Sequence, residues 1–301
     1  MRNILIAIFS LFTISASAAE VIGAGATFPY PLYSKWADEW QKQTGNKLNY
    51  QSIGSGAGIN QIQTKTVTFG ASDMPLTEDV LQKHNMFQFP TVIGGNVIVF
   101  NLDGIKDGEL NLNDSILVDI YLGKIKKWND ESLKKLNPNL NLPNTNITVV
   151  RRSDGSGTTY IFTKYLSTIS KEWESKVGTG TAIEWPVGIG AKGNEGVAGN
   201  VKQTKNSIGY VEYSYAKQNN ISITTLNGIS ANLKSFQNST WPITAPTYII
   251  MHRNPSNAQQ QKTAFEFFKW AFSNGDKIAT DLDYVPLSVE EKNKIIKLFG
   301  E

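Results

Sequence analysis

The sequence predicts an α/β protein with two lobes and a ligand cleft between them, on the basis of three observations. Short apolar and β-branched runs alternate along the chain with segments of helical spacing, which is typical of α/β architecture. The chain has 301 residues, enough for two domains with separate cores. Two apolar runs, residues 89–101 and 247–251, are each placed to cross from one domain into the other. Such crossings would act as hinge strands, with ligands bound at the carboxyl ends of the strands.

Residues 1–19 are predicted to be a secretory signal peptide that is removed from the mature chain. Arg2 precedes an apolar stretch at residues 4–12, and small residues follow as far as position 19. We expect cleavage after Ala18 or Ala19. The apolar stretch is shorter than the roughly 20 residues that a membrane span needs. The mature chain is therefore expected to diffuse freely in a periplasm.

Composition excludes several function classes. The formal net charge of +3 comes from 29 basic and 26 acidic residues, and it falls to +2 (28 − 26) without Arg2. So small an excess argues against a general nucleic-acid binder. The chain has no cysteine, and His84 and His252 do not have the spacing of a metal site. We therefore expect no metal, no cofactor and no catalytic residue.

Residues 21–45 predict a strand, a tight turn and a helix. The strand opens the unit, and the glycine-containing turn occupies residues 23–26. The helix has Pro31 in its first turn and Gly45 at its C-terminal cap. A dinucleotide-binding loop is disfavoured because Phe28 replaces the third glycine of GxGxxG. What remains is a helix start with free backbone N–H groups.

A second unit, residues 48–62, repeats the order of strand, glycine turn and helix. Ser55 lies in its turn but not in a nucleophile elbow, because the glycines around it do not have the GxSxG spacing. Residues 68–73 then predict a strand that ends in Asp73, before a helix capped by Thr77. From these residues alone, Asp73 is either a turn residue or a carboxylate of a site.

The middle and the end of the chain continue the alternation. Helices are expected at residues 115–122 and 132–136, and a strand is expected at residues 208–213. An amphipathic helix is predicted at residues 259–273, with its aromatic side chains in the core. Residues 188–199 are rich in glycine, and no element is assigned to them.

Residues 147–160 give the strongest indication of a binding site. A strand, a glycine turn and a helix start follow one another there, with hydroxyl donors on Ser156 and Thr158. The first N–H groups of a helix lack partners within it and carry partial positive charge, so the place suits an oxyanion. Arg152 adds a planar fork of donors, and Asp154 would hold that guanidinium in position. The alternative is a surface turn before an N-capped helix.

Several long segments, in the same order, resemble the periplasmic phosphate-binding proteins of the Pst-type ABC transporters. The resemblance covers nearly the whole mature chain. The segments are GAGATFPYPLYSKWADEWQKQTG, GASDMPL, FQFPTVIGGN, DIYLGKIKKWND, VVRRSDGSGT and IGYVEYSYAKQNN.

The resemblance implies a type II periplasmic binding protein fold that closes on inorganic phosphate. One lobe would comprise residues 20–92 and 248–301, and the other residues 93–247. It also implies a monomer that delivers phosphate to a membrane permease. The ligand-binding residues implied by the matching positions are Thr27, Phe28, Ser55, Asp73, Arg152, Asp154, Ser156, Gly157 and Thr158.

Two details of the implied site concern its chemistry. Phe28 and Gly157 would contribute backbone N–H groups. Gly56 departs from the family pattern, which has a second serine after Ser55, so a hydroxyl contact is not expected from that position.

Asp73 would make the site selective for phosphate. Near pH 7 phosphate keeps at least one proton and sulfate has none, so a carboxylate can accept a hydrogen bond from phosphate alone. Two other functions stay open on the sequence. They are a secreted phosphatase-like enzyme and a receptor for another oxyanion, such as sulfate or molybdate.

Overall fold

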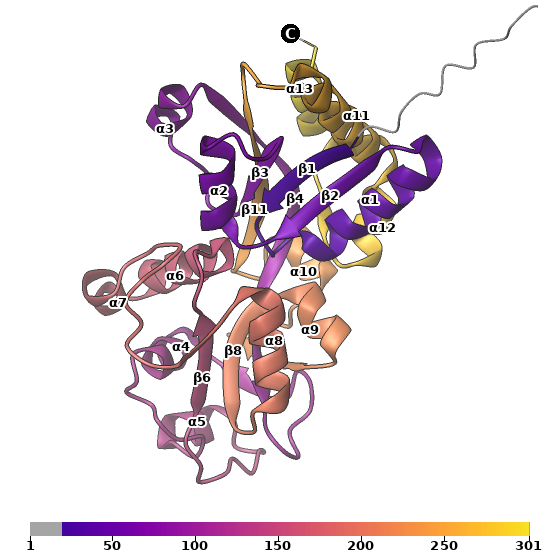
Figure 1. Cartoon of the computed structure of the whole chain (residues 1–301). Coiled ribbons are helices and arrows are strands. Elements are labelled where there is room, and N and C mark those ends of the chain that lie inside the picture. The colour runs from indigo at the N-terminus through magenta and orange to yellow at the C-terminus, as the bar shows by residue number, and fades with distance from the viewer. Residues whose placement is uncertain (1–19, 301) are drawn as a thin grey trace, which may run out of the picture.

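A computed structural model describes residues 20–300. The predicted signal peptide, residues 1–19, lies outside the described residues. Figure 1 shows two lobes, one above the other, that are joined by strands running between them. No helix in residues 20–300 is both long enough and apolar enough to cross a membrane.

The predicted alternation of strands and helices is present. Within residues 20–300 the strands are β1 (Glu20–Gly25), β2 (Lys47–Ser52), β3 (Phe69–Ser72), β4 (Met86–Asn101), β5 (Asn111–Leu112), β6 (Thr148–Arg152), β7 (Ile189–Ala191), β8 (Ser207–Glu212), β9 (Ser222–Ile223), β10 (Thr225–Leu226), β11 (Thr244–His252) and β12 (Val285–Pro286). The helices are α1 (Tyr30–Thr44), α2 (Ser55–Gln63), α3 (Glu78–Lys83), α4 (Asp114–Tyr121), α5 (Glu131–Leu136), α6 (Gly157–Ile169), α7 (Lys171–Lys176), α8 (Gly193–Gln203), α9 (Tyr213–Asn219), α10 (Leu233–Gln237), α11 (Ala258–Asn274), α12 (Asp276–Asp281) and α13 (Val289–Leu298).

One strand, β4, belongs to the sheets of both lobes. The strand order is β2-β1-β3-β11-β4-β8-β6-β7. Residues 86–95 of β4 pair with β11 in the upper lobe of Figure 1, and residues 96–101 pair with β8 in the lower lobe. The strand continues through Gly94 and Gly95 without interruption. Aromatic rings take the space of the missing side chains, because a Cβ at either glycine would lie within 2.4 Å of a phenylalanine ring atom.

Each lobe has its own hydrophobic core. In the upper lobe, α1 and α11 pack on the sheet, and the rings of Trp40 and Phe267 meet edge to face with centroids 5.2 Å apart. In the lower lobe, the ring of Phe162 stacks on that of Tyr210 with centroids 4.4 Å apart. Fully burying one large apolar side chain contributes roughly 1.5–3 kcal/mol to stability. Each cluster contains many such side chains, so each lobe is stabilised by its own core.

Two sequence expectations need correction. The glycine-rich segment 188–199, to which no element was assigned, forms β7 and the start of α8. Glycines weaken helix propensity, but Val197 and Val201 of α8 pack on Gly209 of β8, so tertiary contact overrides the local preference. Thr77 stands at the N-cap of α3 but makes no capping hydrogen bond with its side chain.

Gly58 of α2 lies so close to β1 that no side chain fits there. A Cβ would lie 2.4 Å from Gly25 Cα and 2.7 Å from the carbonyl oxygen of Ala24. We expect Gly58→Ala to lower the free energy of unfolding by about 1–3 kcal/mol, measured by denaturant titration.

Gly199→Ala in α8 is the matched control, because a Cβ there meets no atom within 4 Å. It should leave stability unchanged or raise it by up to about 1 kcal/mol. Equal unfolding midpoints for Gly58→Ala and the parent chain would contradict the close packing of α2 on β1.

Candidate functional site

Four helices begin at the border between the lobes. α1 and α2 belong to the first lobe, which is the upper lobe of Figure 1, and α6 and α8 belong to the second. Side chains at these helix starts contact one another across the border: Thr27 Oγ1, before α1, accepts a hydrogen bond from the backbone N–H of Asn194 in α8 at 3.2 Å. Because each helix start presents N–H groups and partial positive charge, the border suits an anion.

Arg152 lies at the centre of this border and is 3 % exposed. Its Nε donates to Asp154 Oδ1 at 2.7 Å, and its Nη2 donates to Asp154 Oδ2 at 2.5 Å. The pairing suggested by the sequence is therefore present. Nη1 points the other way and lies 3.3 Å from the hydroxyl oxygens of both Thr27 and Thr158. The carboxylate fixes the guanidinium in one orientation.

Asp154 is held in its charged form. Burial raises the pKa of its carboxyl, but the hydrogen bonds and the charge of Arg152 outweigh burial, so the pKa is lowered overall. The backbone N–H of Gly193 also donates to Asp154 Oδ1, at 3.1 Å. Much of the positive charge of Arg152 is therefore already balanced within the protein.

Asp73 supplies a second carboxyl, almost without exposed surface. Its Oδ1 accepts a hydrogen bond from Thr247 Oγ1 at 2.6 Å, and its backbone N–H donates to Ser55 Oγ at 3.3 Å. Among the described residues, Oδ2 is buried and has no hydrogen-bond partner. Burial raises the pKa of Asp73 to about 7, although Thr247, Arg152 and Ser55 each lower it in part. The carboxyl thus keeps one oxygen free inside the site.

Gly157, the first residue of α6, brings the lobes into close contact. A Cβ at this position would lie 2.4 Å from Asp73 Oδ2 and 2.4 Å from Ser55 Oγ, so a side chain would displace both groups. Beside it, the backbone N–H of Gly56 donates to the carbonyl of Gly155 at 2.9 Å. A Cβ at Gly56 would approach Gly155 Cα to 3.1 Å, so the glycine suits this contact.

Ser156 is the N-cap of α6, and Phe28 lies just before the start of α1. Ser156 Oγ caps α6 by accepting a hydrogen bond from the N–H of Thr159 at 3.0 Å. Because that bond uses only a lone pair, the Ser156 hydroxyl can still donate. The ring of Phe28 is buried, and its carbonyl accepts a hydrogen bond from the Tyr284 hydroxyl at 2.7 Å.

The structure brings the predicted site residues together at one border, through the contacts of Arg152, Asp73 and Gly157. Their roles in binding stay predictions. Two further side chains belong to this network and were missed. Asn194 was missed because no helix was expected in its glycine-rich segment, and Thr247 looked like an ordinary strand residue.

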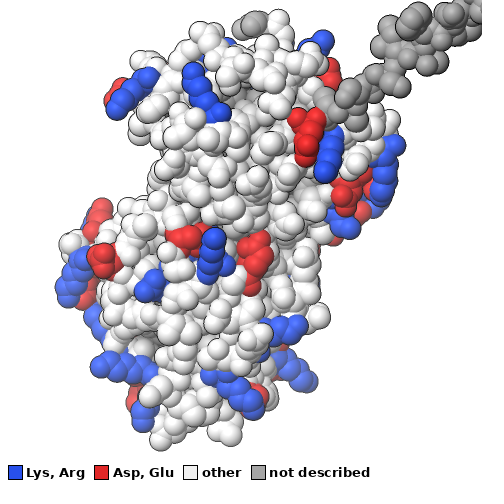
Figure 2. Space-filling model, viewed as in Figure 1, with Lys and Arg blue, Asp and Glu red and all other residues white. Residues whose placement is uncertain are grey.

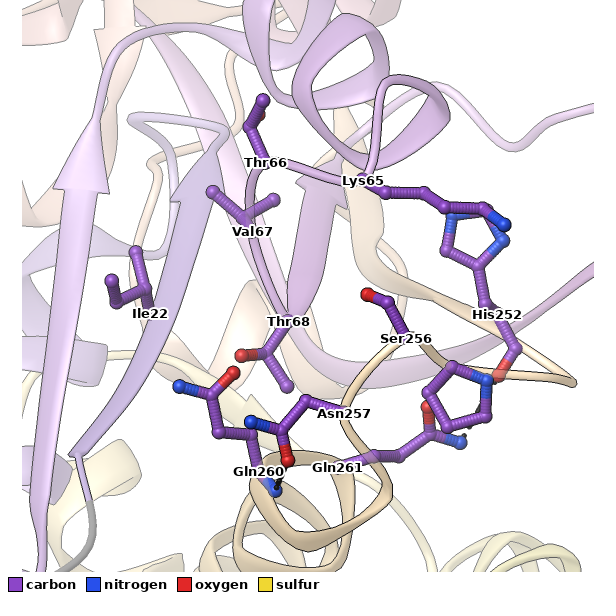
Figure 3. A pocket seen from close by; sticks show the side chains of 11 residues that line it. Ile22, Lys65, Thr66, Val67, Thr68, His252, Ser256, Asn257, Gln260 and Gln261 are labelled. Atoms are coloured by element: carbon purple, nitrogen blue, oxygen red, sulfur yellow. Dashed lines mark hydrogen bonds between the residues drawn. The ribbon is translucent and has the colours of Figure 1, made fainter.

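The pocket shown in Figure 3 is separate from this border. Figure 3 shows a pocket of about 70 Å³ in the first lobe, lined among others by Lys65, Ser256 and His252. None of the predicted site residues lines it, and His252 Nε2 lies 2.6 Å from the carbonyl oxygen of Ile62. On the face shown in Figure 2, acidic and basic side chains are interspersed over both lobes. Residues 20–300 contain no group of three or more histidine or acidic side chains that could hold a metal ion.

Comparison with known proteins assigns the chain to a family. A model of the PBP superfamily domain matches residues 13–275. The phosphate-binding protein PstS of Pasteurella multocida is 47% identical, with 98% of this chain and 94% of the relative covered. PstS of Haemophilus influenzae is 49% identical, with 91% of each chain covered.

Solved structures show the same fold at lower identity. A phosphate-binding protein from Stenotrophomonas maltophilia superposes with a TM-score of 0.71 at 18% identity, covering 93% of each chain. An ABC-type phosphate transport receptor from Vibrio cholerae gives a TM-score of 0.62 at 18% identity, covering 89% of this chain and 100% of that one. With two relatives near half identity over nearly its whole length, the chain belongs to the PstS family of phosphate-binding proteins, which are binding proteins and not enzymes.

Proposed function

We propose that this protein binds inorganic phosphate between its lobes and delivers it to the permease of an ABC importer. Its relatives from Pasteurella and Haemophilus carry the name of phosphate-binding proteins. The observation that carries the proposal is the buried Asp73, whose Oδ2 has no hydrogen-bond partner among the described residues and lies, like the Ser55 hydroxyl, against Gly157 at the start of α6. A site of this kind needs a ligand that is an anion and also has a proton to donate.

The proposed contacts come from both lobes. Thr27, Phe28, Ser55 and Asp73 would bind from the first lobe, with Phe28 acting through its backbone N–H. The second lobe would contribute Arg152, Asp154, Ser156, Gly157 and Thr158. Arg152 is the cation of the site, and Asp154 acts by orienting it.

The lobe boundaries proposed are residues 20–92 with 248–301, and residues 93–247. The division of the two cores supports them, because Val92 and Ile249 belong to one core while Val97 and Ile243 belong to the other. Binding would close the lobes around β4 and β11. Ser52 of the first lobe donates to Glu195 of the second at 2.8 Å, which is the kind of contact that closure would form.

Neutral donors can hold phosphate without matching its charge. Hydrogen bonds to a charged group contribute roughly 1.5–3 kcal/mol each, so about ten of them would offset the dehydration of the anion. One arginine suffices, because its partner Asp154 already compensates part of its charge.

Asp73 is proposed as the acceptor that selects phosphate over sulfate. Phosphate donates its remaining proton to Oδ2, whereas sulfate brings a second acceptor to the same place. Sites built around a required donor reject ligands that lack it by about 10⁴–10⁵.

The proposed location is the periplasm. A solved structure with a TM-score of 0.73 at 19% identity is described as a high-affinity periplasmic phosphate-binding protein. The leader at residues 1–19 has the composition of a signal peptide. Cleavage is proposed after Ala18 or Ala19, and the mature chain is proposed to act as a monomer.

The function predicts tight binding of phosphate. The mature chain, stripped of ligand by unfolding and refolding in phosphate-free buffer, should bind inorganic phosphate at micromolar concentration or below in titration calorimetry. Sulfate and molybdate are the competitors to titrate in parallel. Absence of phosphate binding in this range, or tighter binding of sulfate, would refute the proposed function.

Asp73→Asn should weaken discrimination more than it weakens phosphate binding. The amide can donate to sulfate where the carboxylate repels it, so the ratio of the sulfate and phosphate dissociation constants should fall by at least about tenfold. Asp79→Asn, at an exposed position in the first turn of α3, is the matched control. Equal ratios in Asp73→Asn and the parent would remove Asp73 from its proposed role.

The raised pKa of Asp73 predicts a pH-dependent stability. The carboxyl titrates at about 7 in the folded chain and near 3.8 when unfolded. Between about pH 4 and pH 7 the folded chain therefore holds a proton that the unfolded chain has lost. The contribution of this group to the free energy of unfolding is present in full below about pH 4 and is lost as the pH rises to about 7. The loss reaches up to about 4 kcal/mol.

Asp73→Asn removes this titration. In denaturant titrations without phosphate, the variant should gain stability relative to the parent as the pH rises from about 4 to about 7. A difference between variant and parent that stays constant over this range would show that Asp73 has an ordinary pKa in the folded chain.

A further inference from the structure

Asn194 lies between the two lobes, among the side chains that the proposed function places around phosphate. It is the second residue of α8 and has no exposed surface. Its amide Nδ2 donates to Thr27 Oγ1 at 2.7 Å and to Thr158 Oγ1 at 3.0 Å. Thr27 belongs to the first lobe and Thr158 to the second, so one amide group connects a hydroxyl from each lobe.

The orientation of this amide is fixed from behind. The backbone N–H of Glu212, at the end of β8, donates to Asn194 Oδ1 at 2.9 Å. A backbone N–H can only donate, so the oxygen of the amide must face it. Nδ2, which carries two protons and can only donate, must therefore face the two hydroxyls.

The hydroxyl oxygen of Thr27 consequently accepts hydrogen bonds from neighbouring N–H groups. Its oxygen receives Nδ2 and the backbone N–H of Asn194 and lies 3.3 Å from Nη1 of Arg152. The oxygen of Thr158 likewise receives Nδ2 of Asn194 and Nη1 of Arg152. Neither nitrogen group can accept a proton, so both hydroxyl protons must point elsewhere.

We propose that Asn194 is a positioning residue that turns the hydroxyls of Thr27 and Thr158 into hydrogen-bond donors toward the bound anion. The inference rests on the proposed function, because it assigns the target of the two protons to phosphate. Asn194 acts through the two threonines, and its effect on affinity depends on their hydroxyl groups. The same amide tethers Thr27 to the second lobe, so it also favours the closed arrangement in which both hydroxyls face the ligand.

A double-mutant cycle tests this role on the mature chain, with the phosphate dissociation constant measured by titration calorimetry. Asn194→Ala should weaken phosphate binding about 10- to 100-fold, the loss expected when one or two donors to a charged ligand are no longer oriented. In a Thr27→Val, Thr158→Val background, the same Asn194→Ala change should cost less than about threefold, because no hydroxyl is left to orient.

A merely structural asparagine would give a different result. Asn194→Ala would then weaken binding by the same factor in both backgrounds, and this outcome would overturn the inference. So would an unchanged dissociation constant in Asn194→Ala. Asn200→Ala is the matched control on the same helix, because the exposed Asn200 amide donates to the carbonyl of Gly196 within that helix; it should bind phosphate like the parent.

A second variant covers the case in which Asn194→Ala does not fold. Asn194→Asp keeps the shape of the side chain and the acceptor for the Glu212 N–H, but it faces the threonines with an acceptor. Their protons should turn to the new carboxylate, so phosphate should bind at least about tenfold more weakly, and less so in the double-valine background. Parental affinity in Asn194→Asp would overturn the inference. Loss of phosphate binding in the parent chain would instead refute the proposed function, so the two failures are distinguishable.

Discussion

The pair of the buried Arg152 and the partly buried Asp154 is the interaction on which the site depends. A dry border between two lobes does not tolerate an isolated charge, and the bidentate contact at 2.7 and 2.5 Å leaves the arginine oriented and partly neutralised. An anion entering such a site must be stabilised mainly by dipoles. The four helix starts and the hydroxyl groups at the border meet that requirement.

The second requirement is that the hydrogen-bond donors and acceptors of the site match those of the ligand. Thr247 occupies one oxygen of Asp73 and leaves the other free, while Asn194 and Arg152 occupy the acceptor side of two threonine hydroxyls. One acceptor and many donors therefore face the same space. Both common protonation states of phosphate keep at least one proton, so the free oxygen of Asp73 could accept a hydrogen bond from either of them.

Local patterns predicted much of the fold, because a strand, a glycine turn and a helix are encoded by neighbouring residues, as in β6 and α6. The residue pattern itself indicated Arg152, Asp154, Ser156 and Thr158 as an anion site, whereas the full set of site residues was implied by the family resemblance. The sequence did not predict α8, because its glycines disfavour a helix in the absence of tertiary contacts. The roles of Asn194 and Thr247 depend on partners 167 and 174 residues away, a relation that no local pattern contains.

The place of β11 in the sheet also has a consequence for the order in which the chain can fold. β11 lies between β3 and β4, so the first lobe lacks a central strand until residue 252 has been synthesised. The second lobe has β4, β6, β7 and β8 once residue 212 is present. A chain that emerges from its N-terminus can thus pair the main strands of the inserted lobe first, although the core of that lobe also needs Trp241 and Ile243. Strands β1 to β3 must wait for β11, which begins at residue 244.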